Sequence, residues 1–147
     1  MVLIGEAPGE NEDLQGIPFC GSAGKELDII LNLVGIDDFI ILNVLKCRPP
    51  ENRDPLKEEI EACGGWLDKQ LDIIKPKLIV LMGKSSIRKF FPEKKNVTMR
   101  NLRGRFFNND DYNNIKFFVT YHPASILYDR KKKDFIIKDF KKIKNEI

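Results

Sequence analysis

The residues best placed to do chemistry lie in a loop that follows the first short apolar run of the chain. Residues 5–24 are rich in glycine and include two prolines, one phenylalanine and four carboxylates. Glycine lets a backbone approach a ligand closely, and proline fixes the shape of a loop. Because the loop is acidic, it suits a pocket that activates water or stabilises a cation better than a pocket that holds phosphate.

A phosphate-binding loop is the main alternative for this glycine-rich segment. Residues 21–25, GSAGK, resemble part of the motif G-x-x-x-x-G-K-[ST]. The first glycine of that motif would fall on Phe19, and its final hydroxyl residue would fall on Glu26. The motif fails at both positions and no G-x-G-x-x-G occurs, so the sequence disfavours nucleotide hydrolysis.

Two further polar side chains end apolar runs elsewhere in the chain. Asn43 lies near the end of residues 39–44, and His122, the only histidine, follows residues 116–121 and precedes a proline. A lone histidine is often structural. The proline after it, however, keeps the backbone extended beyond the end of the strand, and this position favours a site residue. If the strands are parallel, their carboxyl ends share one edge, and the loop, Asn43 and His122 are expected to meet there.

Alternating strand and helix patterns must position these residues. Apolar runs predict strands at 2–4, 39–44, 78–82 and 116–121, a hairpin or two short strands at 97–99 and 104–107, and helices at 24–34, 55–74, 84–91 and 134–147. The alternation predicts an α/β fold, a three-layer α/β/α sandwich around a central, mainly parallel sheet of about four strands. We expect residues 1–147 to form one domain.

The charge of the chain is strongly segregated. Residues 83–105 contain eight basic residues and one acid, and residues 129–147 contain eight basic residues and four acids. Such segments suit an enzyme that binds the charged backbone of a polyanion. The lysine run at 131–133 is also consistent with a solvent-exposed helix face that has no binding role. The chain lacks the apolar run of about 18 residues needed for a membrane span and lacks a secretory signal, so we expect a cytoplasmic protein.

The motifs in combination resemble those of a known family. The segments GEAPG, PFCGSAG, NVLKCRPP, LRGR and YHPA occur in the order, and over essentially the whole length, of family 4 uracil-DNA glycosylases, the thermostable type that carries an iron–sulfur cluster. The resemblance implies a monofunctional enzyme of base excision repair. Such an enzyme flips uracil, the product of cytosine deamination, out of DNA and hydrolyses its N-glycosidic bond, which leaves an abasic site.

The resemblance also implies roles for individual residues in binding uracil. Phe19 would stack on the base, and the Asn43 amide would pair with O4 and N3–H of uracil. His122 would donate a hydrogen bond to O2 as negative charge builds there. Ala7 is expected in the uracil pocket, at the position where the best-known uracil glycosylases have an aspartate.

Two carboxylates resemble the catalytic positions of this family. We expect Glu12 to lie closest to the water and the sugar, and Glu6 to shape the pocket. For Glu6, a purely loop-bracing role is an equal alternative.

Contacts to DNA are implied mainly for the segment that follows His122. Leu127 is the expected wedge that fills the gap left by a flipped base, with Ile126 next. Ser22 and Ser125 are expected to bind phosphate through their hydroxyls. Arg130 is the expected substitute for the arginine that often follows the wedge in this family, because Tyr128 stands at that position here. For Arg103 and Arg105, bracing of the fold and phosphate contact remain equal alternatives.

The three cysteines give an incomplete set of cluster ligands. Cys47 and Cys63 match two of the four thiolates expected for a 4Fe–4S cluster, whereas Cys20 replaces an apolar residue of the family. The other two ligands would form a C-x-x-C pair before the first strand, where this chain begins. We therefore expect a truncated N-terminus and an incomplete or absent cluster. A zinc site is disfavoured because no C-x-x-C occurs.

The expected partner is uracil-containing DNA, single- or double-stranded, and a replication clamp is a further candidate partner. We expect the protein to be a monomer and not to associate with membranes. One alternative is a catalytically weak or inactive glycosylase-like protein that binds nucleic acid. Another is a small-molecule α/β enzyme unrelated to DNA, whose activity would not respond to salt as DNA binding must.

Overall fold

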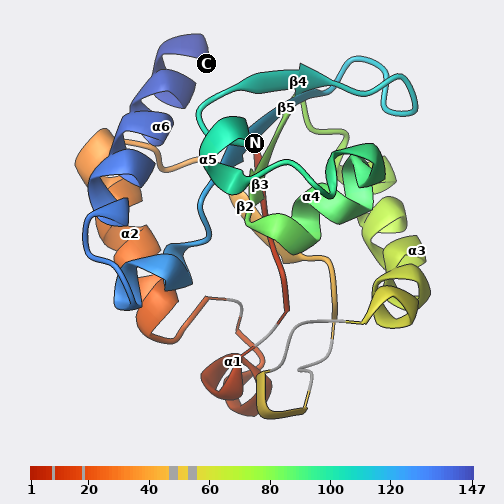
Figure 1. Cartoon of the computed structure of the whole chain (residues 1–147), viewed down its shortest axis with the longest axis horizontal. Helices are drawn as coiled ribbons and strands as arrows, with labels where there is room; N and C mark the ends of the chain where they lie inside the picture. Colours follow the sequence, from red (N-terminus) through yellow and green to blue (C-terminus); the bar gives the residue numbers. More distant parts are fainter. Residues whose placement is uncertain (8, 18, 47–49, 53–55) are drawn as a thin grey trace.

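A central parallel sheet organises the computed structural model, which describes residues 1–7, 9–17, 19–46, 50–52 and 56–147 (Figure 1). The strand order is β2-β1-β3-β5-β4. The strands are β1 (Val2–Gly5), β2 (Ile40–Asn43), β3 (Leu78–Met82), β4 (Phe106–Asn108) and β5 (Lys116–Thr120). Only β4 runs antiparallel to its neighbour among these strands, so the expected mainly parallel sheet is confirmed, with five strands in place of about four.

The two central strands have no solvent-facing side. Every residue of β1 and of β3 is buried, which explains why both read as continuous apolar runs rather than as alternating patterns. Val2 pairs with Ile79 on one side and with Ile40 on the other. The sheet therefore needs a layer of helices on each face.

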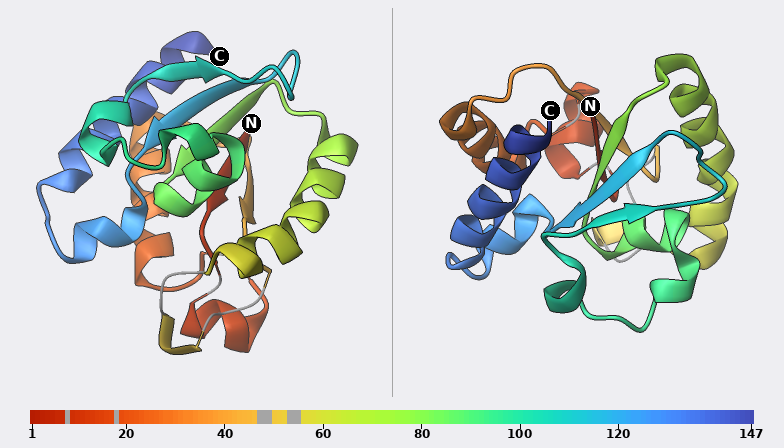
Figure 2. Two further views of the ribbon diagram at one scale, coloured as in Figure 1. Left: turned by 45° about the vertical axis from the view of Figure 1, so that its right-hand side comes forward. Right: turned by 90° about the horizontal axis from the view of Figure 1, so that it is seen from above.

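Helices cover both faces, as the view from above in Figure 2 shows. The helices α2 (Ser22–Val34) and α6 (Lys132–Glu146) pack on one face through Leu27, Ile30 and Phe140. The helices α3 (Lys57–Ile74) and α4 (Lys84–Phe90) pack on the other through Leu67 and Phe90. The three-layer α/β/α sandwich is thus confirmed.

Helix ends follow local rules that the sequence makes visible. Gly35 adopts a left-handed conformation (φ 81°) and ends α2, and its N–H bonds back to Leu31. Lys75 ends α3 in the same conformation, one residue before Pro76. The observed bounds of the long helices differ from the predicted ones by at most two residues.

Several short elements correct the sequence-based expectations. The loop at 5–24 contains the helix α1 (Glu10–Gln15), which is too polar to show an apolar period. The expected strand at 97–99 is wrong, because Thr98 precedes the four-residue helix α5 (Met99–Leu102). The remaining short elements are the 3-10 turns η1 (Pro50–Asn52), η2 (Pro92–Lys94) and η3 (Pro123–Leu127).

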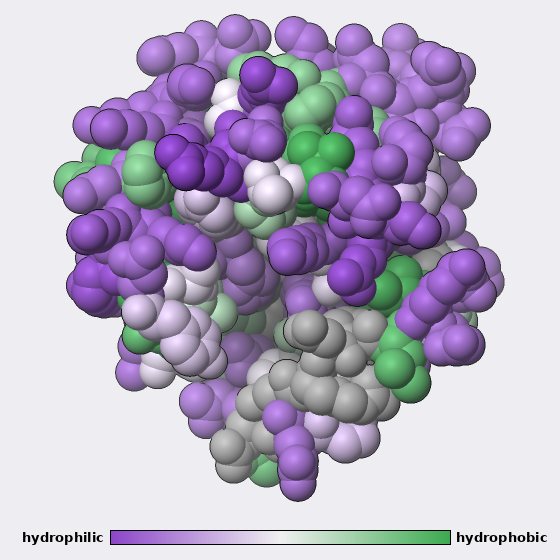
Figure 3. Space-filling view, in the orientation of Figure 1, coloured by the Kyte–Doolittle hydropathy of each residue, from purple (hydrophilic) through white to green (hydrophobic). Residues whose placement is uncertain are grey.

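The surface in the orientation of Figure 1 is mostly hydrophilic, with scattered apolar residues (Figure 3). None of the helices in the described part of the chain is both long and apolar enough to cross a bilayer.

Candidate functional site

The polar residues predicted to form a site lie at the carboxyl edge of the parallel sheet. Asn43 ends β2 and pairs in register with Gly5, the last residue of β1. Met82 of β3 pairs with Thr120 of β5, so Gly83 and His122 follow two neighbouring strand ends. This edge is where α/β folds bind ligands, because the loops that leave the strands diverge there.

Gly5 allows two of the predicted side chains to approach each other. A Cβ atom added at Gly5 would lie 2.7 Å from Asn43 Oδ1 and 2.8 Å from Phe19 Cζ. The amide of Asn43 and the ring of Phe19 therefore both border the backbone of this residue. Any side chain at position 5 would have to push at least one of them away.

The position of Phe19 is fixed by its backbone. Phe19 adopts φ 53°, a conformation that side-chain-bearing residues rarely take. A Cβ atom at Gly24 would lie 1.8 Å from the carbonyl oxygen of Phe19, so the first turns of α2 press directly against this carbonyl. The ring of Phe19 stacks on His122, with centroids 5.6 Å apart and an interplanar angle of 30°. Phe19 thereby joins Asn43 and His122 into one group.

Asn43 presents a hydrogen-bond acceptor that has no partner within the described part of the chain. Its side chain is 8% exposed, and its Oδ1 atom is buried without a hydrogen bond. Such a group costs about 1–3 kcal/mol unless something satisfies it. Asn43 lines a cavity of about 420 Å³ together with Glu12, Lys46 and Gln70. Its Oδ1 atom lies on the Gly5 and Phe19 side, and neither Phe19 nor His122 is among the residues that line this cavity.

Lys46 holds the exit of β2 against α3. Its Nζ atom donates to the Asn43 carbonyl at 2.8 Å and to Gln70 Oε1 at 2.5 Å. Burial lowers the pKa of this ammonium group, and the nearby Cys63 opposes that shift. The backbone of Asn43 is therefore tied to the helix layer through its carbonyl, whereas its buried side-chain oxygen takes no hydrogen bond from the described residues.

His122 is held as a neutral donor. Its Nδ1 atom accepts the Ala124 N–H at 3.0 Å, which places the ring proton on Nε2. Burial lowers the pKa of His122 to about 4, so the ring is uncharged at neutral pH. The side chain can thus donate one hydrogen bond through Nε2 but does not carry a positive charge.

The two predicted carboxylates have different surroundings. Glu6 accepts a hydrogen bond from the buried Ser85 hydroxyl at 2.8 Å, and Ser85 belongs to α4. Glu12 lies on α1, and Cβ atoms added at Gly9 and Gly21 would lie 3.3 and 3.4 Å from its carboxylate. Only Glu12 of this pair lines the cavity that Asn43 shares. Ala7, also predicted for the pocket, packs against the core on the α3 side of the sheet.

The predicted DNA-contacting residues separate into exposed and bracing groups. Leu127 is 49% exposed, but Ile126 is completely buried in the core, which corrects its expected place as a second wedge. Ser125 donates its hydroxyl to the His122 carbonyl at 2.7 Å, and Arg130 pairs with Glu26 at 2.8 Å. Ser22 stays exposed at the start of α2.

The cysteines are partly outside the described residues. Cys47 lies outside them, while Cys63 is half-buried on α3 with a free thiol, as Cys20 is in the loop before α2. In the chain segments that the structure describes, no three His, Cys, Asp or Glu side chains gather in a way that could hold a metal ion.

Sequence reasoning missed two ion-pair networks. Arg103 donates from Nε and Nη2 to Asp139, whose carboxylate also accepts the Thr120 hydroxyl at 2.7 Å. Of the two roles considered for Arg103, this contact favours bracing. Glu26 receives Lys133 as well as Arg130. No local pattern signals these pairs, because their members lie far apart in the sequence.

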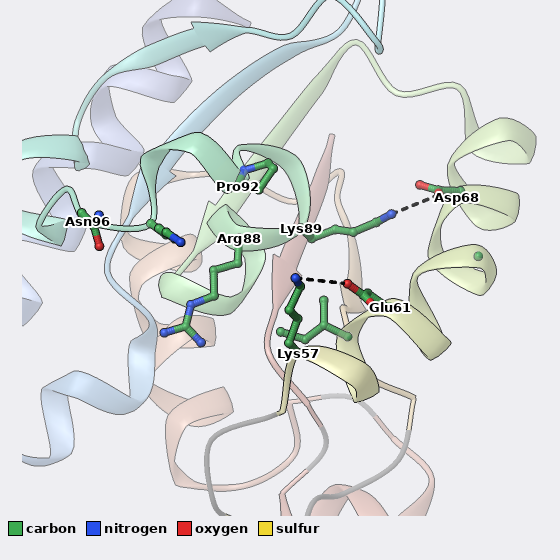
Figure 4. A pocket seen from close by; sticks show the side chains of 10 residues that line it. Lys57, Glu61, Asp68, Arg88, Lys89, Pro92 and Asn96 are labelled. Carbon is green, nitrogen blue, oxygen red and sulfur yellow. Dashed lines mark hydrogen bonds and ion pairs between the residues drawn. The ribbon is translucent and has the colours of Figure 1, made fainter.

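A second cavity lies between α3 and α4 (Figure 4). It measures about 880 Å³ and is lined by Lys57, Arg88, Lys89, Lys95, Glu61 and Asp68, among others. Lys57 faces Glu61 at 3.8 Å and Lys89 binds Asp68 at 3.0 Å. The Arg88 guanidinium points away from both pairs in Figure 4. The basic composition of residues 83–105 is the sequence signal for this groove.

Comparisons with known proteins identify the family. The Uracil DNA glycosylase superfamily matches residues 1–144. The type-4 uracil-DNA glycosylase of Saccharolobus solfataricus is 42% identical, with 100% of this chain and 71% of the relative aligned. For Sulfurisphaera tokodaii the values are 43%, 98% and 68%, and for Archaeoglobus fulgidus 41%, 97% and 74%. The chain therefore belongs to the uracil-DNA glycosylase superfamily and, within it, to the type-4 enzymes.

Proposed function

We propose that this protein is a monofunctional uracil-DNA glycosylase that flips uracil out of DNA and hydrolyses the bond between deoxyribose C1′ and uracil N1. The unpartnered Oδ1 atom of Asn43, beside the ring of Phe19, is the observation that carries this proposal. Excision would leave an abasic site, because no lysine stands at a position that resembles the nucleophile of bifunctional glycosylases. The Lys46 amine, which lies in a matched motif, is engaged by the Asn43 carbonyl and by Gln70.

Recognition of uracil rests on Asn43 and Phe19. Uracil presents an N–H donor at N3 beside an acceptor at O4, and the Asn43 amide offers the complementary acceptor and donor. The buried Oδ1 atom would accept N3–H, which relieves its missing hydrogen bond. Cytosine presents the reversed pattern at these positions and would leave the amide unpaired. The Phe19 ring would support the face of the base.

Stabilisation of the leaving base rests on His122. When the glycosidic bond breaks, negative charge spreads over the uracil ring and its oxygens. A neutral histidine whose Nε2–H is already oriented can donate to O2 without reorganising in the transition state. The hydrogen bond from the Ala124 N–H to Nδ1 supplies that orientation.

Positioning of water is assigned to Glu12. We expect Glu12→Gln to lower kcat on single-stranded uracil-containing DNA by about 10²-fold or more, within the range for loss of a general base. The measurement is single-turnover excision at saturating enzyme. Asp28→Asn, an isosteric change of an exposed carboxylate on α2, serves as the matched control. Full turnover by Glu12→Gln would remove this assignment and shift attention to Glu6.

Close packing at Gly5 predicts a second effect on activity. We expect Gly5→Ala to lower kcat/KM by about 10²-fold, because its Cβ atom displaces Asn43 or Phe19 by a sizeable fraction of an ångström. Thermal stability should also fall, by the roughly 1–3 kcal/mol that overpacking costs, because Asn43 is buried and the Phe19 ring is stacked on His122. Gly65→Ala on α3 meets no atom within 4 Å and is the control. Equal activity of the two variants would show that the site does not depend on this contact.

The family resemblance implies an iron–sulfur cluster held by cysteine thiolates. We propose Cys47 and Cys63 as the thiolates that this chain contributes. A 4Fe–4S cluster takes four thiolates, and the described residues do not assemble such a set. The steps proposed above therefore rest on the chain's own polar and aromatic side chains, and the cluster takes no part in them.

Binding of DNA is proposed through the segment after His122 and the basic surface. Leu127 is the proposed wedge, and Ser22 a phosphate contact. Arg130 already pairs with Glu26, so we propose that it positions the wedge segment as well as facing phosphate. A single domain over residues 1–147, a monomeric state, a cytoplasmic location and a clamp partner remain predictions.

The decisive test is a gel assay on oligonucleotides that carry one uracil, single-stranded or opposite guanine. We expect strand cleavage after alkali but not before it, which identifies an abasic product. Asn43→Ala protein purified in parallel shows whether the activity belongs to this chain. Binding of the DNA without any alkali-labile product would overturn the proposal in favour of a non-catalytic nucleic-acid-binding protein.

A further inference from the structure

The segment that follows the site ends in two adjacent exposed apolar side chains. Leu127 is 49% exposed, and Tyr128 is 90% exposed at the end of η3. Tyrosine usually covers most of its ring when a protein folds, because the ring is large and apolar. Among the described residues, no aromatic or cationic side chain stacks on the ring of Tyr128. Both faces of this ring are therefore open to a partner.

The backbone beneath this ring is held firmly. The Tyr128 and Asp129 amides donate to the Ser125 carbonyl at 3.3 and 3.0 Å, and Ser125 in turn binds His122 through its hydroxyl. Ile126 anchors the turn in the core between α2 and α6. The position of Tyr128 is thus coupled to that of the proposed donor His122.

Two ion pairs to the neighbouring helix α2 also hold this segment in place. Glu26 of α2 binds Arg130 at 2.8 Å and Lys133 at 3.0 Å, on either side of the start of α6. The segment lies beside α2 in Figures 1 and 2. An exposed aromatic ring on a well-held turn loses less conformational entropy on binding than a ring on a flexible loop.

We propose that Tyr128 is a stacking platform for a nucleobase that loses its neighbour when uracil leaves the helix. This inference rests on the proposed function, since it needs a flipped nucleotide. Leu127 then fills the gap, and the phenol ring covers the face of a base next to it. Stacking on an aromatic ring needs no particular base, which suits an enzyme that must act in any sequence. The base belongs either to the opposite strand or to the damaged strand beside the gap.

A binding measurement tests this without requiring catalysis. The probe is a fluorescent duplex with a tetrahydrofuran abasic analogue opposite guanine, titrated with the full chain. We expect Tyr128→Ala to raise Kd by about 5- to 150-fold, the equivalent of one lost base–aromatic stack. Tyr128→Phe keeps the ring and should stay within about twofold of the parent. Trp66→Ala, which removes an exposed ring on α3, is the matched control and should not change Kd.

Two further probes locate the base. If the ring covers the opposite-strand base, replacing that guanine with a second abasic analogue abolishes the difference between the parent and Tyr128→Ala. If it covers a base of the damaged strand, the difference persists there and in single-stranded DNA. Equal Kd values for the parent and Tyr128→Ala on all probes overturn the inference, as does an equal loss in Tyr128→Phe or Trp66→Ala. Failure of uracil excision in the gel assay would refute the proposed function, and these Kd values would still report on Tyr128.

Discussion

Replacing His122 with asparagine is expected to lower kcat for uracil excision by about 10²- to 10³-fold, the usual loss when one preorganised donor to a developing anion is removed. The change is chosen because the asparagine Oδ1 atom lies near the position of Nδ1. It can keep the hydrogen bond from the Ala124 N–H, which holds the turn at 3.0 Å in the parent. The donor at Nε2 is lost, so the effect should fall on kcat and leave KM nearly unchanged.

The companion variant His122→Gln distinguishes the effect of losing the Nε2–H donor from the effect of losing the hydrogen bond that holds the turn. Its terminal amide lies near the position of Nε2 and can donate to uracil O2, while it cannot accept the Ala124 N–H. We therefore expect His122→Gln to keep more of the parent kcat than His122→Asn and to lose more thermal stability. Single-turnover rates and melting curves of both proteins give the two readouts. The reverse order of the two rates would contradict a role for the Nε2–H donor.

The pH profile provides a further check on the same residue. A histidine with its ordinary pKa would change charge near pH 6.5. Burial lowers the pKa of His122 to about 4, so the neutral ring persists as pH falls through 6.5 and gains its proton only near 4. The parent kcat/KM should therefore be level from about pH 8 to about pH 5.5 on account of this group. A tenfold rise in kcat/KM as pH falls through 6.5 would mean that a cationic histidine is needed, and a tenfold fall would mean that His122 keeps its ordinary pKa.

The strands and the long helices could be predicted because each depends on a local pattern. The buried runs of β1 and β3 are continuous, and the α2 stripe of Leu27, Ile30 and Leu31 repeats at the helical period. The helices α1 and α5 could not be predicted, because six and four residues are too few to show a period. Their caps carry no side-chain hydrogen bond that would mark them.

The candidate site was predictable where it depends on strand ends and not where it depends on distant contacts. Asn43 and His122 end apolar runs, so parallel pairing alone brings them to one edge. The unpartnered Oδ1 atom, the neutral state of His122 and the unusual backbone of Phe19 follow from tertiary packing. The bond between Arg130 and Glu26 spans 104 residues, and no local spacing encodes it.

Removing the carboxylate of Asp139 is expected to cause the largest loss of stability. Asp139 is completely buried, and it binds Arg103, whose side chain is only 19% exposed, together with the buried Thr120 hydroxyl. Burial raises the pKa of Asp139, and the hydrogen bonds from Arg103 and Thr120 oppose that shift. Breaking a buried pair leaves an uncompensated charge, so we expect Asp139→Ala to lower the free energy of unfolding by about 3–5 kcal/mol. Urea denaturation measures this loss.

The matched control lies on the same helix. Glu146 of α6 faces Lys116 at 3.7 Å, with side chains 51% and 62% exposed, and Glu146→Ala removes the same charge. An exposed pair contributes about 0–1 kcal/mol, so this variant should unfold close to the parent. Similar losses in the two variants would show that burial of Asp139 does not set the effect.

The double variant Asp139→Ala with Arg103→Met tests whether the loss of stability comes from the unpaired Arg103 guanidinium. Methionine keeps an apolar stem over Phe135, whose ring the Arg103 guanidinium covers at 4.9 Å. Once the charge is removed, the double variant should be more stable than Asp139→Ala alone, because replacing both members of a buried pair is far less costly than breaking it. Thr120 lies two residues before His122, so the same network fixes the strand end from which the proposed donor emerges. A double variant that unfolds as easily as Asp139→Ala would place the loss at Thr120 and the strand end rather than at Arg103.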